Sequence, residues 1–337
     1  MIDVLIAGGG PAGLAAGIHA ALAGLRSVVV EPRTTPVDKA CGEGIMPGGV
    51  AALRALGVEV SGRELRGIRY RDGARGAEAC FRDGTGLGVR RTELHTALRR
   101  RADALGVETV RGKVGEVWQG GDRVVAGGRT ARWLIAADGL HSPVRRGLGL
   151  DLPDRAPSRY GLRRHFHVAP WSHFVEVHWS RHGEAYVTPV GDGLVGVTVL
   201  SRERRGFGEH LAHFPELAPL LGERPASGVR GAGPLRQRVS NPLAGRVLLV
   251  GDAAGYVDAL TGEGVALALS TAGAAVRALA EGRPQTYPAA WSKLTRRHRV
   301  LTEGLLIATR GPRRSRMIVP AAARLPALFA AAVHALQ

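Results

Sequence analysis

The chain has 337 residues, of which 45% are hydrophobic and 22% charged, so it can bury a large core and has an ordinary globular composition. Its formal charge of +17 comes almost entirely from arginine, and because no RRM, KH, zinc-finger or basic-helix motif accompanies it, we expect no nucleic-acid partner. No run reaches roughly 18 apolar residues, and two cysteines make no disulfide framework or metal cluster, so we expect no transmembrane segment and no metal site.

The N-terminal segment predicts a strand over residues 2–7, a helix over 12–24 and a second strand over 27–31. This order indicates a parallel βαβ unit, because parallel neighbours need a crossover connection. No basic region precedes the first apolar run, and no small-residue cleavage site follows it. We therefore expect no signal peptide and a cytoplasmic protein.

A glycine turn, G-x-G-x-x-G, connects the first strand to its helix through Gly8, Gly10 and Gly13. The first glycine permits the tight turn, the second lets the backbone approach a pyrophosphate, and the third lets the helix pack on the strand. The free N–H groups of the helix N-terminus then face the anion. Glu31 lies 18 residues beyond Gly13, close to the spacing of a carboxylate that accepts from ribose hydroxyls. The predicted dinucleotide site also includes Pro11, Ala12, Pro32 and Arg33.

The later elements predict an α/β fold with a Rossmann-type domain, an inserted, mostly antiparallel β-sheet substrate domain and a helical C-terminus. In chain order we expect a helix near 48–57, short strands over 58–90, a helix over 91–105, a buried strand over 133–138, an antiparallel sheet over 151–235, a strand over 246–250 and a long helix from Gly264. The expected division gives 1–75, 90–150 and 240–280 to the nucleotide-binding domain, 76–89 and 151–239 to the β-rich domain, and 281–337 to C-terminal helices.

Two later segments complete a resemblance to a known family. Residues 137–145 read ADGLHSPVR, residues 251–255 read GDAAG, and residues 260–264 read LTGEG. With the glycine turn and Glu31, they resemble the DG and GD motifs of the FAD-binding superfamily that includes aromatic hydroxylases and geranylgeranyl reductases. The resemblance implies that FAD is the cofactor and that Asp252 accepts from its ribityl hydroxyls.

The resemblance also implies further contacts with FAD. Arg91 opens RTELHTAL, which is similar to a family helix start whose arginine reaches the cofactor; Arg90 is the alternative. Val114 matches a strand whose backbone borders the adenine. The Asp138 motif also holds the fold together in this family. The remaining implied contacts are Cys41, Gly42, Asp138, Gly139, Gly251, Gly262, Gly264 and Val265.

The reductant and the reaction are predicted from the rest of the sequence. A second G-x-G-x-x-G and a C-x4-C pair are both missing from the sequence, so we expect NADH or NADPH to bind transiently, or a separate protein to supply electrons. The K-x-C-G-x-G loop at residues 39–44 resembles the geranylgeranyl reductase branch. Cys41 is expected near the isoalloxazine, where it positions or protonates a substrate or fills space. Cys80 is expected in the core.

The segment 184–189, EAYVTP, departs from the aromatic-rich segment of the reductases. Tyr186 and Pro189 keep part of that pattern, whereas Glu184 and Thr188 replace two aromatics. This departure also removes the halogenase motif. It favours an NAD(P)H-using monooxygenase that hydroxylates a hydrophobic aromatic or polyketide-like metabolite, with Tyr186 as a second candidate catalytic residue. A geranylgeranyl-type alkene reductase is the alternative, and a non-catalytic prenyl-binding protein is a minor one.

Two other features bear on substrate binding. His165, His167, His173 and His178 are expected to be surface imidazoles, although His165 and His167 share a face that suits a phenol. Residues 318–336 are expected to form two short helices that pack on the core, cover the substrate pocket or touch a lipid surface peripherally. No sequence pattern predicts the oligomeric state.

Overall fold

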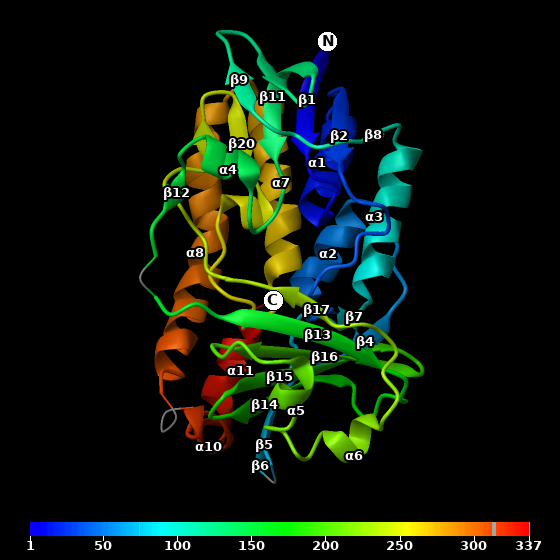
Figure 1. Ribbon diagram of the computed structural model, residues 1–337, viewed down its shortest axis with the longest axis vertical. Coiled ribbons are helices and arrows are strands. Elements are labelled where there is room, and N and C mark those ends of the chain that lie inside the picture. Colours follow the sequence, from blue (N-terminus) through cyan, green and yellow to red (C-terminus); the bar gives the residue numbers. More distant parts are fainter. Residues whose placement is uncertain (74, 155, 312–314, 337) are drawn as a thin grey trace.

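A computed structural model of the protein describes residues 1–73, 75–154, 156–311 and 315–336. It contains two large sheets, one in the upper and one in the lower half of Figure 1. The upper sheet, here the parallel sheet, has the order β19-β20-β11-β1-β2-β8, with the β9-β10 hairpin beside β11. β1 pairs in parallel with both β11 and β2. Its strands are β1 (Ile2–Ala7), β2 (Ser27–Glu31), β8 (Glu108–Arg111), β9 (Val117–Gln119), β10 (Val124–Ala126), β11 (Arg129–Ala136), β19 (Leu243–Ala244) and β20 (Val247–Leu249).

Both faces of the parallel sheet are buried, which explains its continuous apolar strands. Side chains alternate along β1, so that Val4 and Ile6 belong to one hydrophobic cluster while Leu5 and Ala7 belong to another. The first cluster lies against the helices of one face. The second lies against the β9-β10 hairpin and the short helix α4 (Pro143–Gly147). The helices that contribute to the first cluster are α1 (Pro11–Leu22), α2 (Pro47–Ala55), α3 (Arg91–Ala104) and α7 (Gly264–Ala280).

The lower sheet, here the antiparallel sheet, has the order β17-β13-β16-β15-β14-β5-β6. Its pairs are antiparallel except for β14 with β5. Its strands are β5 (Gly67–Asp72), β6 (Arg75–Cys80), β13 (Tyr160–Phe166), β14 (Phe174–Ser180), β15 (Gly183–Gly191), β16 (Leu194–Ser201) and β17 (Arg230–Ala232). A small third sheet consists of β3 (Gly44–Ile45), β7 (Gly86–Gly88) and β4 (Arg63–Leu65), which flank β5 and β6 in the chain. Smaller elements are β12 (Asp151–Leu152), β18 (Arg238–Val239), α5 (Phe207–Leu211), α6 (Ala218–Leu221) and η2 (Pro284–Thr286).

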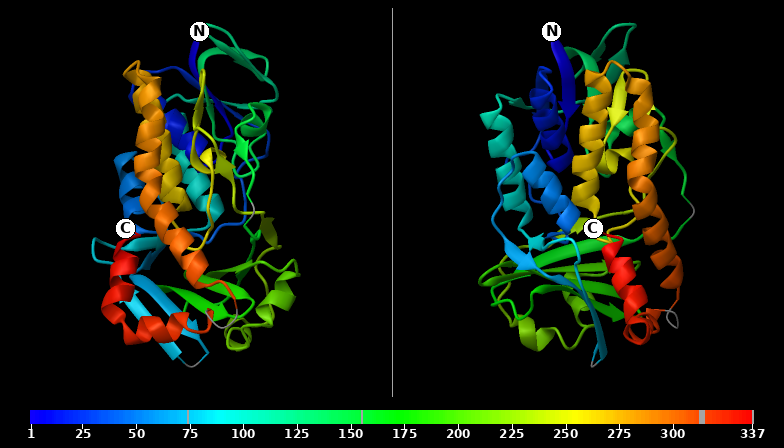
Figure 2. Two further views of the ribbon diagram at one scale, coloured as in Figure 1. Left: turned by 90° about the vertical axis from the view of Figure 1, so that its left-hand side faces the viewer. Right: turned by 180° about the vertical axis from the view of Figure 1, so that it is seen from behind.

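The C-terminal part of the chain is helical, as expected. The long helix α8 (Tyr287–Ala308) runs beside both halves of the molecule in Figure 2. Helices α10 (Ile318–Arg324) and α11 (Pro326–His334) pack on β5 and β6, where Val319 and Phe329 join the core of the antiparallel sheet. In the described part of the chain, no helix combines the length and the apolar character that crossing a bilayer requires.

The fold class is confirmed, and several local expectations are corrected. Val114 lies in the connection between β8 and β9 rather than in a strand, although it is buried against the parallel sheet. Cys80 is exposed rather than in the core, because side chains alternate along the edge strand β6 and the preceding residue, Ala79, takes the buried side. The division into domains stays a prediction; in the structure, β5 (Gly67–Asp72) pairs with β14 of the antiparallel sheet.

A buried ion network stabilises the antiparallel sheet at Glu176 on β14. Its Oε1 accepts from Arg69 Nη1 at 3.0 Å, and its Oε2 accepts from Trp171 Nε1 at 3.1 Å. Burial works to raise the pKa of Glu176, but hydrogen bonds from His178, Trp171 and Arg69 outweigh it and lower the pKa to about 2. Because the folded pKa is depressed, the stabilisation is present above the unfolded value of 4.5 and is lost as pH falls toward 2.

Glu176→Gln is therefore expected to lower the free energy of unfolding at pH 7 by about 2 kcal/mol, the scale of hydrogen bonds to a charged group. The difference from the wild type should shrink as pH falls below 4.5. Urea unfolding between pH 7 and pH 4 measures it. Glu78→Gln is the matched control, because Glu78 pairs with the same Arg69 but is 55% exposed, so its effect should stay below about 1 kcal/mol. Equal losses in both variants would contradict the assignment.

Candidate functional site

The glycine turn lies where β1 ends and α1 begins, at the carboxyl edge of the parallel sheet. Gly8 has a φ of +99°, and a Cβ on it would lie 2.5 Å from the carbonyl oxygen of Ala137. A Cβ on Gly13 would lie only 1.8 Å from the carbonyl oxygen of Gly8. Among the described residues, no side chain caps the N-terminus of α1. Its free N–H groups are therefore available to an anion.

Glu31, at the end of β2, is buried and already satisfied by the protein. Its Oε2 accepts from Gly9 N at 2.7 Å, and its Oε1 accepts from Arg33 Nε at 2.7 Å. Burial raises the pKa of Glu31, but the hydrogen bonds from Arg33 and Gly9 outweigh it and lower the pKa. The Arg33 side chain, which is 40% exposed, covers the carboxylate.

Positive charge gathers around the turn. Arg91 Nη2 lies 3.9 Å from the Cβ position of Gly10, and Lys39 Nζ lies 3.1 Å from that of Gly139. Burial lowers the pKa of Lys39, and repulsion from Arg33 and Arg91 lowers it further. Arg91 Nε is buried and has no acceptor among the described residues. A buried unsatisfied cation indicates an acceptor supplied by a ligand, and a pyrophosphate provides one.

The DG and GD segments contribute two buried carboxyl groups. Asp138 Oδ2 accepts from Val144 N at the start of α4, while its Oδ1 has no partner among the described residues. Asp252 lies in η1 (Gly251–Ala254). Burial raises the pKa of both carboxyls, and in Asp252 the charges of Lys39 and Arg91 oppose that rise. Asp252 thus faces the same cations as the glycine turn, and the predicted residues Gly262, Gly264 and Val265 lie at or near the N-terminus of α7.

These residues fit FAD. The glycine turn, the free N–H groups and the cations suit its pyrophosphate, and the unsatisfied Arg91 Nε supplies a donor. Asp252 and the N-terminus of α7 suit the ribityl hydroxyls and the ring end. The structure therefore brings together the glycine turn, Glu31, Arg91, Asp138 and Asp252, which the sequence places up to 244 residues apart. Which of them contact the cofactor stays a prediction.

The Cys41 loop lies across the central strands of the antiparallel sheet. Thr188 Oγ1 on β15 donates to Gly42 O at 2.8 Å, and Thr198 Oγ1 on β16 donates to Cys41 O at 3.2 Å. The Cys41 thiol is half-buried and accepts from Glu43 N at 3.4 Å. Burial raises its pKa, so the group is a thiol rather than a thiolate at neutral pH.

Glu43 holds this loop in a strained conformation. It has a φ of +60°, uncommon for a residue with a side chain, and only 4% of it is exposed. Its Oε1 accepts from Arg91 N at 2.9 Å, and its Oε2 lies 2.6 Å from His165 Nε2. A Cβ on Gly196 would lie 2.8 Å from that same Oε2, so the glycine makes room for the carboxylate. Glu43 therefore connects the Cys41 loop, α3 and the antiparallel sheet.

Two of the four histidines expected at the surface, His165 and His178, are buried instead. His165 and His178 are each 1% exposed, and both lie beside carboxylates. His167 and His173 are exposed, so alternation does not bring His165 and His167 to one face. The alternation of buried and less buried side chains along β13 is broken at Phe166, the last residue of the strand, which is buried like its neighbour His165.

Two tyrosines lie close to the site and differ in their partners. The hydroxyl of Tyr186, the second candidate catalytic residue, donates to Leu260 O at 3.0 Å, so its proton is already engaged. The Tyr256 hydroxyl has no hydrogen bond among the described residues. Burial raises the pKa of Tyr256, and the charges of Asp252 and Asp258 and the Cys41 thiolate would raise it further. Glu43 and Thr198 could not be identified from sequence, because each is significant only through a partner distant in sequence, and Tyr256 could not, because its significance lies in its burial beside Asp252 and Asp258.

Arg91→Met is expected to weaken FAD binding about 10- to 100-fold, because it removes a charged donor while keeping the apolar stem. Flavin fluorescence during titration of the stripped protein measures the affinity. Arg90→Met is the matched control, since Arg90 is the alternative occupant and its Nε is also unsatisfied. Equal or greater weakening by Arg90→Met would assign the contact to Arg90 instead.

Comparison with known proteins identifies the class of chemistry. Residues 1–215 match the FAD binding domain family. The chain is 32% identical to a menaquinone reductase of Mycolicibacterium smegmatis, over 88% of this chain and 80% of that protein. It is 29% identical to digeranylgeranylglycerophospholipid reductase 1 of Methanothermobacter thermautotrophicus, over 78% of this chain and 73% of that protein.

A shorter match points to another reaction. A stretch of 74 residues, 22% of this chain and 17% of its relative, is 45% identical to a 6-methylpretetramide 4-monooxygenase of Streptomyces rimosus. Among solved structures, a geranylgeranyl bacteriochlorophyll reductase-like protein from Thermoplasma acidophilum shares the fold with a TM-score of 0.71 and 23% identity, over 96% of this chain and 87% of that one. The resemblance drawn from the motifs is therefore confirmed.

Proposed function

Since this chain belongs to the FAD binding domain family and is an FAD-dependent oxidoreductase, we propose that it reduces a carbon–carbon double bond in a polyprenyl compound. Two relatives that match most of the chain are named as reductases of compounds that carry polyprenyl chains. This proposal reverses the preference drawn from residues 184–189. The replaced aromatics there weigh less, because Thr188 has a structural partner in Gly42.

The Cys41 loop is the observation that carries the proposal. Reduction of an alkene replaces its π bond by two C–H bonds, one formed by a hydride and one by a proton. FAD, when bound and reduced, supplies the hydride. Cys41 supplies the proton from Sγ, since burial keeps the thiol protonated. The positive charge of Arg91 opposes the rise in the pKa of the thiol and so favours release of the proton. The thiolate left behind regains its proton from solvent.

The neighbouring residues position this thiol. Thr188 and Thr198 fix the loop carbonyls, and Glu43 fixes the backbone N–H that reaches the sulfur. Tyr186 cannot donate without breaking its hydrogen bond to Leu260 O. The Tyr256 hydroxyl, protonated at neutral pH, is available to orient the substrate. A transient NADH or NADPH is proposed as the source of electrons.

The test is an anaerobic single turnover of the FAD-loaded protein, reduced with dithionite and mixed with geranylgeraniol. We expect a product heavier by two hydrogens in mass spectrometry. Cys41→Ala should slow its formation about 100-fold at unchanged flavin content, the scale of general acid catalysis. Cys80→Ala, which removes the exposed cysteine on β6, should have no effect. Equal rates in the two variants would exclude Cys41 as the proton donor.

Hydroxylation is the second candidate, favoured by the match of 74 residues to a monooxygenase. The same mixture in the presence of O₂ and NADPH tests it with aromatic polyketide substrates. A product heavier by one oxygen, together with no hydrogenated polyprenyl product, would replace the proposed reductase by a hydroxylase.

A further inference from the structure

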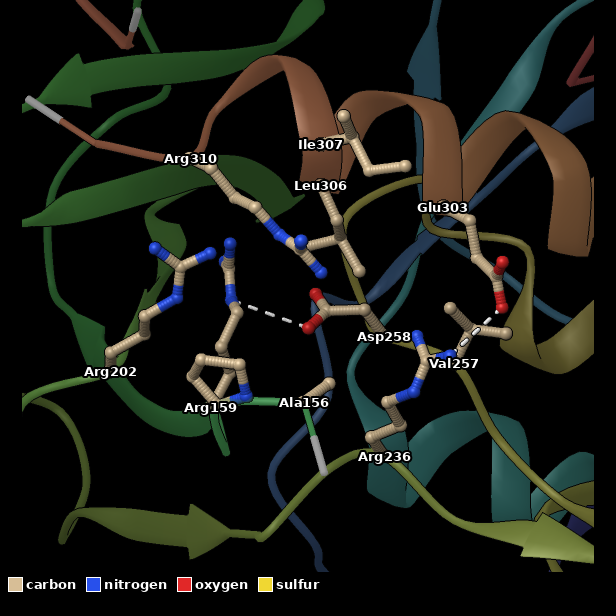
Figure 3. Close-up of a pocket in the computed structure, with 11 residues that line it drawn as sticks. Ala156, Arg159, Arg202, Arg236, Val257, Asp258, Glu303, Leu306, Ile307 and Arg310 are labelled. Carbon is tan, nitrogen blue, oxygen red and sulfur yellow. Dashed lines mark hydrogen bonds and ion pairs between the residues drawn. The ribbon is translucent and has the colours of Figure 1, made fainter. Parts of the chain in front are cut away.

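A cavity of about 70 Å³ lies beside the C-terminal half of α8, away from the glycine turn. Figure 3 shows side chains entering it from the segment before β13, from the end of β16, from the loop after η1 and from α8. Its lining is rich in arginine. The lining residues are Ala156, Pro157, Arg159, Arg202, Arg236, Val257, Asp258, Glu303, Leu306, Ile307 and Arg310.

The arginines of this cavity are not equally neutralised. Arg236 donates to Asp154 and to Glu303. Arg159, of which 6% is exposed, pairs with Glu184 and Asp258. Within the described residues, the guanidinium groups of Arg202 and Arg310 have neither a hydrogen bond nor an ion pair. Two cations that line one cavity thus lack a counterion in the protein.

The guanidinium groups of Arg159, Arg202 and Arg310 lie close together in Figure 3. Partial burial lowers the pKa of Arg202, and repulsion from Arg159 and Arg310 adds to that effect. Four arginines and two carboxylates line the cavity, and Glu184 and Asp154 beyond the lining also pair with Arg159 and Arg236, so the unpaired positive charge of the lining is that of Arg202 and Arg310. Like charges at this proximity are costly unless an anion is placed between them.

We propose that this cavity binds the phosphate or diphosphate group of an amphiphilic ligand. Guanidinium groups recognise phosphate oxygens through paired N–H donors, and Arg202 and Arg310 have all of theirs available. The volume is several times the roughly 10–15 Å³ that a cavity needs to hold one water molecule, so there is room for a phosphate group. Val257, Leu306 and Ile307 form an apolar wall beside the arginines, which suits the start of a hydrocarbon chain.

This site adds a ligand-binding group to the proposed function. The proposal rests on that function only for the part of the ligand that lies beyond the phosphate. Two sources supply a phosphate: a phosphorylated polyprenyl substrate and a nicotinamide dinucleotide. The apolar wall favours the first. Asp258 connects the cavity to the flavin-binding region, since it follows the GD segment by a few residues in the chain.

The experiment titrates inorganic pyrophosphate into the FAD-loaded protein by isothermal calorimetry. Because FAD occupies the glycine turn, pyrophosphate is excluded from that site. We expect the Arg202→Ala/Arg310→Ala variant to bind about 100-fold more weakly, about tenfold for each charged donor removed. Arg54→Ala/Arg224→Ala is the matched control, because it removes two exposed arginines that also lack side-chain partners within the described residues. Its affinity should stay within about twofold of the wild type.

Circular dichroism and flavin content should be unchanged in both double variants, since all four side chains are exposed. Absence of pyrophosphate binding by the wild type, or equal weakening in both variants, would overturn the proposal. No turnover is involved, so failure of alkene reduction leaves this result unaffected. Geranylgeranyl diphosphate against geranylgeraniol, and NADPH against NADH, then distinguish the two sources: the affinity lost in Arg202→Ala/Arg310→Ala identifies the ligand that uses the site.

Discussion

Gly13→Ala is expected to abolish FAD binding and to lower the free energy of unfolding by about 3 kcal/mol, the upper range for overpacking. The added Cβ would lie 1.8 Å from the carbonyl oxygen of Gly8. That oxygen belongs to the backbone of the glycine turn and cannot rotate away as a side chain can. α1 would have to move off β1, and its N-terminus would then no longer face the pyrophosphate.

Flavin absorbance after purification and urea unfolding measure the two effects. Gly304→Ala in α8 is the matched control, because Gly304 is also helical but, outside its own helix backbone, no atom of the described residues lies within 4 Å of its Cβ position. It should bind FAD normally and gain about 1 kcal/mol from helix propensity. Normal flavin content in Gly13→Ala would show that the turn tolerates the shift and that the close packing of α1 is not required.

Arg159→Met is expected to lower the free energy of unfolding by about 3–5 kcal/mol at pH 8, the scale of breaking a buried ion pair. Arg159 joins Glu184 on β15 to Asp258 in the loop after η1, so it connects the antiparallel sheet to the segment that follows the GD motif. Methionine fills the space but leaves both buried carboxylates without a counterion. Arg283→Met is the control, because Arg283 and Glu281 form an exposed pair expected to contribute less than about 1 kcal/mol.

The loss in free energy of unfolding caused by Arg159→Met should be smaller at pH 5 than at pH 8. Burial raises the pKa of Asp258 to about 6, and the charge of Arg159 opposes that rise. The folded protein therefore retains this proton between the unfolded value of 3.8 and about 6, so ionising Asp258 costs stability as pH rises through that window. Without Arg159 the pKa of Asp258 in the folded protein would rise further, so the pH range over which ionisation of Asp258 costs stability would extend upward. Urea unfolding at both pH values measures the difference, and a loss independent of pH would show that Asp258 stays ionised.

Local patterns predicted most of the fold correctly. The strand, turn, helix and second strand at the N-terminus appear as β1, α1 and β2, because apolar periodicity and glycine position are read directly from neighbouring residues. The antiparallel character of residues 151–235 was predicted in the same way. Val114 and Cys80 were assigned incorrectly, since the end of a strand and the position of an edge depend on which strands pair.

The candidate site was only partly predictable. Gly8, Gly13 and Asp252 could be predicted as site residues, since their motifs combine residue type with a fixed local spacing. Glu43 and His165 could not, because they lie 122 residues apart and their pairing exists only after the Cys41 loop packs on the antiparallel sheet. The burial of His165 and His178 likewise follows from partners on other strands and loops.

The sequence by itself determined the cofactor and the class of fold, because both depend on short motifs whose backbone requirements are local. The tertiary structure alone decided which polar groups are engaged and which are available. It engages the Tyr186 hydroxyl with Leu260 O, holds the Cys41 thiol protonated, and leaves Arg202 and Arg310 without counterions among the described residues. The physical reason is that burial and long-range contacts set the charge and hydrogen bonding of a side chain, and neither is a property of its neighbours in sequence.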